Sequence, residues 1–197
     1  MLLAVEDPLS EVVARRILAS VSPRREVSLC LGLKGKDYLR QKAENLNQAS
    51  KGSPVFLLTD LDDPKDCPAG LIRSWLKTTR QPNFILRVAV MEVESWIMAD
   101  REGFARFLSV LPERIPFDTD SIPRPKEFLV SLARQSRSSR LREDLVPVAG
   151  GTSKVGPAYN LQLASFVTQS WNPEAAAKVS HSLRRALHRA KELSPSG

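Results

Sequence analysis

Apolar positions in the first half of the chain fall into two kinds of stretch, separated by Gly, Pro, Ser and Asp. Short, nearly continuous apolar runs are typical of buried strands, whereas apolar residues three and four apart are typical of helices. The runs predict strands at Leu2–Val5, Glu26–Leu31, Val55–Thr59 and Asn83–Val90. The helical spacing predicts helices from Pro8 to the Ser22-Pro23 break, over 37–50, over Ala69–Thr78 and, interrupted near Asp100, over Glu92–Leu111.

Strands that alternate with helix-length connections predict a parallel sheet with helices on its faces, an α/β fold. The pattern changes after residue 111, and the next stretch, 112–125, holds four prolines and predicts a loop. Helices follow at 126–134, at 158–169 and from Asn172-Pro173, the last with a second cap at Ser180 or Ser182. We therefore expect an α/β core over 1–111 and a basic, loop-rich and helical extension over 112–197, packed on the same domain.

Length and composition fit an ordinary globular domain. The chain has 197 residues, close to one domain of about 150. Its hydrophobic fraction of 42% and charged fraction of 26% exclude a collagen-like or wholly disordered protein. Aromatic residues make up 6%, few for a surface that stacks on bases, so we expect Trp75, Trp96 and Trp171 to be core residues.

Cysteine content and hydropathy predict a cytoplasmic protein. The two cysteines, Cys30 and Cys67, are too few for a disulfide framework, and with His181 and His188 they match no zinc spacing. No apolar run reaches the roughly 18 residues of a membrane span. The start of the chain lacks the basic region and cleavage site of a signal peptide.

The positive charge is concentrated in the second half. The net charge is +7; residues 1–100 hold 14 Lys and Arg against 13 Asp and Glu, and residues 101–197 hold 15 against 9. This asymmetry favours a polyanionic partner, with an ordinary solvated basic surface as the alternative. The segment RQSRSSRLR lacks an apolar stripe, so we expect its arginines to be solvent-facing, mobile and paired with nucleic-acid phosphates. These arginines are Arg134, Arg137, Arg140 and Arg142.

Acidic residues follow the predicted strands, at the ends where parallel sheets bind ligands. Glu6 follows the first strand, Asp60 and Asp62 follow the third, and Glu94 comes shortly after the fourth. Repulsion raises the pKa of clustered acids, and a hard divalent cation such as Mg²⁺ or Mn²⁺ relieves it. We expect Glu6, Asp60 and Asp62 to share a metal. Glu94 is either a further ligand or a helix cap, and Glu11 is either a ligand or a residue that favours the start of its helix.

Two known families show this order of acids. Val5-Glu6-Asp7 with Leu58-Thr59-Asp60 resembles a response-regulator receiver domain, in which an aspartate after the third strand accepts phosphate. Glu6 followed by Asp60-x-Asp62 resembles the Toprim fold of topoisomerases, primases and OLD-type nucleases. Val5–Glu11 is similar to the V-E-G-x-x-E start of the OLD-type branch, with Asp7 at the glycine and Glu11 one position later. Glu92–Asp100 is similar to an E-x-W-x-L-A-D segment of small stand-alone Toprim-like proteins of unknown function.

The Toprim-like resemblance covers residues 1–105 and implies Mg²⁺-dependent, nuclease-like phosphodiester chemistry on nucleic acid. It implies that Asp60 and Asp62 are metal ligands, that Glu6 is a ligand or general base, and that Glu11 belongs to a second metal. Lys154, in the glycine-rich segment 148–157, is either a phosphate contact in the catalytic site or an ordinary loop lysine.

Two alternatives remain open. One is a non-catalytic Toprim-like binding module in a defence or repair assembly, and the other is a receiver-like phosphoacceptor. Toprim domains of OLD-type proteins are coupled to an ATPase. Because this chain has no G-x-x-x-x-G-K-[ST] segment, we expect any ATPase to be a separate partner.

Overall fold

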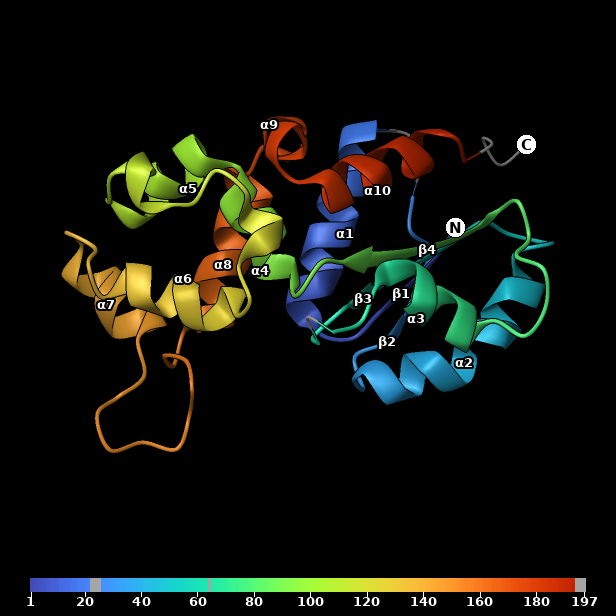
Figure 1. Cartoon of the computed structure of the whole chain (residues 1–197), viewed down its shortest axis with the longest axis horizontal. Coiled ribbons are helices and arrows are strands. Elements are labelled where there is room, and N and C mark those ends of the chain that lie inside the picture. The colour runs from blue at the N-terminus through green and yellow to red at the C-terminus, as the bar shows by residue number, and fades with distance from the viewer. Residues whose placement is uncertain (22–25, 64, 194–197) are drawn as a thin grey trace.

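The sheet holds four parallel strands, and it confirms the predicted α/β class. The computed structural model describes residues 1–21, 26–63 and 65–193. The strands lie in the order β2-β1-β3-β4 (Figure 1), so the carboxyl ends of β1 and β3 are adjacent, as the acidic residues predict. Their bounds are Leu2–Val5 for β1, Leu29–Gly32 for β2, Val55–Asp60 for β3 and Phe84–Ala89 for β4.

Strand β2 is shorter than its sequence predicts. It begins at Leu29 rather than Glu26, because Leu29 pairs with Leu2, where β1 itself begins. It ends at Gly32, whose φ of 108° lies in the left-handed region. A Cβ at this position would lie 2.0 Å from the carbonyl oxygen of Val5, so only glycine lets the chain pass so close to β1.

Two pairs of helices cover the two faces of the sheet. Helices α2 (Lys36–Ala49) and α3 (Pro68–Trp75) lie on one face, over Leu57 and Leu86. Helices α1 (Pro8–Val21) and α10 (His181–Lys191) lie on the other face, over residues such as Leu58 and Ile85. This arrangement follows from the alternation of side chains along each strand, and it buries β3 completely.

The remaining helices form a layer beside the carboxyl edge of the sheet (Figure 1). Trp96 and Trp171 are fully buried there and Trp75 is buried under α3, which confirms the prediction that all three are core residues. The segment RQSRSSRLR is not an irregular tail, because Ser138 caps a helix that begins at Ser139. The helices are α4 (Val93–Ala99), α5 (Arg101–Leu108), α6 (Pro125–Ala133), α7 (Ser139–Leu145), α8 (Tyr159–Gln169) and α9 (Pro173–Val179), with short 3-10 turns at Pro112–Arg114 and Thr119–Ser121.

The C-terminal half returns to the sheet and shares its apolar core. Helix α8 packs against α1, and α10 packs against both α1 and β4. Leu163 and Leu187 therefore lie in the same apolar cluster as Leu3 and Phe56. None of the helices in the described parts of the chain is long and apolar enough to cross a membrane.

Candidate functional site

Three carboxylates gather where β1, β3 and α4 meet, and we call Glu6, Asp60 and Glu94 the acidic edge. Glu6 follows β1, Asp60 ends β3, and Glu94 lies in the first turn of α4. The hydroxyl of Thr59 and the backbone N–H of Asp60, the latter at 2.9 Å, both donate to Oε1 of Glu6. These bonds hold Glu6 against the end of the neighbouring strand and lower its pKa, but desolvation by burial is the larger effect and raises it.

The backbone around the acidic edge is in an uncommon conformation. Leu33, Asp62 and Met91 follow β2, β3 and β4, and all three have left-handed φ values, of 58°, 65° and 64°. Such angles are rare for Leu and Met because the side chain crowds the backbone. The N–H of Asp62 donates to the carbonyl of Met91 at 3.0 Å and so ties two of these turns together. Strain of this kind concentrates at functional sites.

Asp60 is the least compensated member of the acidic edge. It is 7% exposed, and its Oδ1 is buried without a hydrogen-bond partner in the described structure. Desolvation raises the pKa of Asp60 well above its usual value, and repulsion from Glu94 and Glu6 raises it further. A buried carboxylate oxygen that lacks a donor is the position at which a cation would be stabilised.

Glu94 is held by two residues that sequence reasoning missed. It is 2% exposed; the Tyr159 hydroxyl donates to its Oε1 at 3.2 Å, and the Lys126 ammonium lies 3.5 Å from the same atom. Desolvation raises the pKa of Glu94 even though Lys126 opposes it. Desolvation lowers the pKa of Lys126, but the attraction of Glu94 and Glu92 outweighs it and leaves that pKa raised.

Glu94 does not cap its helix, so that alternative is wrong. The residue at the N-cap of α4 is Glu92, and Glu94 lies inside the first turn with its side chain buried. Glu92 instead fixes the start of α6, because its Oε2 accepts the backbone N–H of Lys126 at 2.8 Å. Its Oε1 lies 3.9 Å from the Lys126 ammonium, so this one lysine bridges both acids.

Asp62 and Glu11 turn away from the acidic edge. The Asp62 side chain is 52% exposed and accepts a bond of 2.8 Å from the Lys36 ammonium, which also donates to the carbonyl of Leu61. Glu11 pairs with Arg15, one turn along α1, at 2.8 Å. Burial and the neighbouring Glu11 raise the pKa of the Cys30 thiol to about 11. Asp62 and Glu11 thus interact with side chains outside the acidic edge.

A pocket of about 480 Å³ opens beside the acidic edge. Asp62, Met91, Glu92 and Lys126 line it, and Lys154 reaches it from the loop between α7 and α8. The structure thus brings Lys154 to the same pocket as three acidic residues, Asp62, Glu92 and Glu127. Arg124, Lys126 and Lys154 balance their charge, so the lining is mixed rather than positive.

The donor chemistry of the acidic edge fits a hard cation. Its oxygen atoms belong to carboxylates, the groups that Mg²⁺ and Mn²⁺ prefer. Oδ1 of Asp60 has no hydrogen-bond partner in the described structure. Within the described ranges, no three Asp, Glu, His or Cys side chains are arranged to hold a metal ion. Two acids near Asp60 are paired with lysines rather than with a metal: Glu94 with Lys126, and Asp62 with Lys36.

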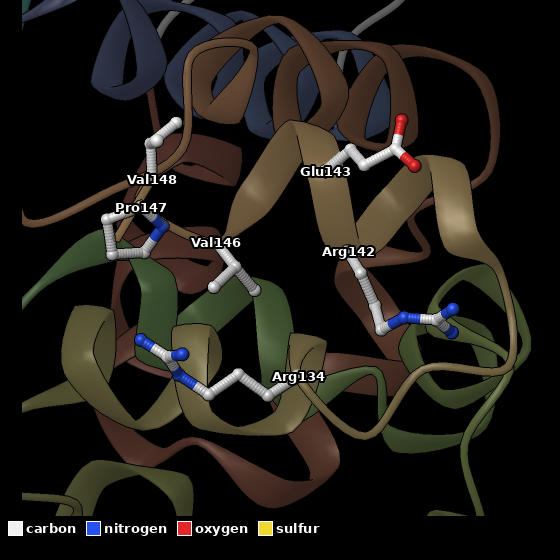
Figure 2. Close-up of a pocket in the computed structure, with 6 residues that line it drawn as sticks. All are labelled: Arg134, Arg142, Glu143, Val146, Pro147 and Val148. Atoms are coloured by element: carbon white, nitrogen blue, oxygen red, sulfur yellow. The ribbon is translucent and has the colours of Figure 1, made fainter. Parts of the chain in front are cut away.

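The four arginines of RQSRSSRLR do not form one patch. Arg134 and Arg142 line a separate pocket of about 530 Å³, and Figure 2 shows their guanidinium groups pointing in different directions. Arg142 donates to the carbonyl of Ser136, and Arg140 lies 3.6 Å from Asp144. Arg137 is exposed. The expectation that all four are mobile and solvent-facing is therefore wrong for Arg142, which is half-buried and bonded to the backbone.

Comparison with known proteins adds no relative, because no family model, curated protein or solved structure matches this chain. The functional argument therefore depends on the site itself.

Proposed function

We propose that the acidic edge is a Mg²⁺- or Mn²⁺-dependent site for phosphodiester chemistry on nucleic acid. The observation that carries this proposal is the buried, unpartnered Oδ1 of Asp60 beside Glu6 and Glu94 in the described structure. Ligand sites of open parallel sheets lie at the carboxyl ends of the strands, where these residues stand. The adjoining pocket, of about 480 Å³, has the size to admit a phosphate group, and Lys154 on its wall is the residue that would contact it.

Asp60 would hold the cation, and Glu6 and Glu94 would join it only after their side chains reorient, because no three acids of the described residues are arranged as metal ligands. A divalent cation there would supply Lewis-acid stabilisation of the charge that develops in phosphodiester hydrolysis. Glu6 keeps Oε1 on Thr59 and Asp60, which leaves Oε2 to bind the cation or to accept a proton. Burial raises the pKa of Glu6 above its ordinary value, which is the direction that favours a general base. Lys154 contacts the phosphate.

Burial of Asp60 favours this proposal over a receiver-like phosphoacceptor. An acceptor aspartate must meet its phosphoryl donor, yet Asp60 is 7% exposed. We place the activity in the cytoplasm, because Cys30 and Cys67 are both free thiols, and we assign any ATPase to a separate protein. The non-catalytic binding module is an outcome that the experiment below distinguishes.

The test is cleavage of end-labelled single-stranded DNA, duplex DNA and RNA with Mg²⁺ or Mn²⁺, and with EDTA as the metal-free control. Asp60→Asn should lower the rate by about a hundredfold or more, since it removes a ligand charge. Asp66→Asn is the matched control; Asp66 is exposed in the loop after β3, so this variant should cleave at the wild-type rate. Nucleic-acid binding without cleavage under any metal would leave only the binding module, and cleavage that survives in EDTA or in Asp60→Asn would refute the proposed site.

A further inference from the structure

Arg87 occupies an unusual position for an arginine, inside a strand. It lies in β4, an edge strand of the sheet, and it is half-buried. Arg87 pairs with Leu58 and shares the face of Ile85 and Ala89, which α10 covers. Its Nε is buried without a hydrogen-bond partner in the described structure. Unpaired buried donors are rare and point to a missing partner, such as an ion.

Three further arginines lie near enough to repel the charge of Arg87, and we call Arg80, Arg87, Arg185 and Arg189 the arginine cluster. Desolvation is the main cause that lowers the pKa of Arg87 to about 10, and repulsion from the other three arginines adds to it. Glu192 offsets part of this charge and pairs with Arg189. Within the described residues, Glu192 offsets only part of the charge of the four arginines, which leaves positive charge near β4.

The fold holds the members of the arginine cluster in place. Arg185 and Arg189 lie one turn apart on α10, which packs against β4 (Figure 1). Arg80 lies in the loop before β4, which hydrogen bonds from α2 fix on both sides. Asn47, which is fully buried, donates to the carbonyl of Thr79 at 3.1 Å and accepts the N–H of Gln81 at 2.8 Å. The backbone positions of Arg80, Arg185 and Arg189 are therefore fixed by hydrogen bonds and helix packing.

We propose that the arginine cluster binds the phosphate backbone of nucleic acid. A phosphate that binds at the exposed Arg80 and Arg185 neutralises the repulsion among the four guanidinium groups, whose fork geometry matches phosphate oxygens. The choice of nucleic acid as the polyanion rests on the proposed function. The mutual repulsion and the unpaired donor weaken the fold, which is the usual cost of a binding residue.

Arg87 is the member of the arginine cluster whose backbone lies near Asp60, whereas Arg80 precedes β4 and lies at the opposite, amino ends of the strands. Asp60 pairs with Ala89, two residues after Arg87, so Asp60 and Arg87 share one face of the sheet. With a rise of about 3.3 Å per residue and a strand spacing of about 4.8 Å, their backbones are separated by about 8 Å.

The test measures binding of a fluorescein-labelled DNA duplex by anisotropy, in EDTA, so that cleavage plays no part. The variant is Arg87→Met with Arg185→Ala; methionine keeps the apolar stem of Arg87 in the fold. Loss of two phosphate contacts should flatten the plot of log K against log salt by about 1.8. The advantage of the wild type over the variant should then shrink about tenfold between about 50 and 200 mM salt.

The matched control is Lys178→Ala with Arg184→Ala, which removes the same charge from the groove between α9 and α10. Its slope should stay within a fraction of a unit of the wild type. Any of three results would overturn the inference. The slopes could be equal for all three proteins, both variants could flatten the slope equally, or the wild type could fail to bind duplex DNA.

A second readout is thermal unfolding. Arg87→Met alone should raise the melting temperature by a few degrees, because it removes the unpaired donor and the repulsion; a fall would show that Arg87 has a partner within the fold. Arg185→Ala alone, an exposed change, repeats the binding test if the double variant fails to fold. Binding that depends on the cluster without any cleavage would sustain this inference and refute the proposed catalysis.

Discussion

Replacement of Asp60 by asparagine should stabilise the protein at neutral pH. Asp60 is buried, its Oδ1 lacks a donor in the described structure, and Glu94 and Glu6 repel its charge. An unsatisfied buried polar group costs about 1–3 kcal/mol, and a charged one costs more. The amide that replaces the carboxylate carries no charge, so we expect the free energy of unfolding at pH 7 to rise by about 1–3 kcal/mol in metal-free buffer.

The pH dependence identifies the cause of this gain. The pKa of Asp60 is raised in the folded state, so at this residue the folded protein binds more protons than the unfolded chain. The contribution of Asp60 to wild-type stability therefore falls as the pH rises above 3.8, the ordinary pKa of an aspartate. Asp60→Asn does not lose stability in this way, because its amide does not titrate. The two proteins should therefore be similarly stable near pH 3, and the variant should gain as the pH increases toward 7.

Urea unfolding between pH 3 and 8, monitored by the buried tryptophans, measures this difference, with Asp66→Asn as the control. Mg²⁺ in large excess should reverse the order, because it binds the folded wild type and adds about 2.7 kcal/mol at about a hundred times its dissociation constant. Asp60→Asn should not respond to Mg²⁺. A variant that is less stable than the wild type by the same amount at every pH would show that Asp60 is satisfied within the fold, and the reasoning would fail.

Two further predictions concern the remaining charges. Lys126→Met should destabilise the protein by about 1–3 kcal/mol, because it leaves Glu94 buried without the lysine ammonium that pairs with it. Adding Glu94→Gln should restore most of the lost stability, measured by chemical denaturation. A loss that the second substitution does not restore would assign Lys126 a packing role instead. Alanine at Arg137, Arg140 and Arg142 together should flatten the salt dependence of duplex binding by about one unit rather than three, since Arg142 is bonded to Ser136 and Arg140 is paired with Asp144. A change of three units in the anisotropy titration would restore this segment as the principal phosphate-binding surface.

Local patterns in the sequence predict the elements of this fold well. The apolar run Val55–Thr59 predicts a buried strand, and the structure adds only Asp60 to it. The Asn172-Pro173 pair predicts the start of α9, and Asn172 caps it as expected. Of the two caps predicted further on, Ser180 and Ser182, the structure uses Ser180 for α10. These features depend on neighbours within about four residues, through helical hydrogen bonds and side-chain periodicity, so they can be seen in the sequence alone.

Tertiary structure alone decided which side chains meet. The sequence places Glu6, Asp60 and Glu94 after three different elements, and the strand order brings them to one edge. Lys126 follows Glu92 by 34 residues, and no local signal links the two. Likewise, Arg87 meets α10 only because the chain returns to the sheet after the helical layer. Apolar burial drives that return without regard to charge, so the charged neighbours of each site become visible only when the core is packed.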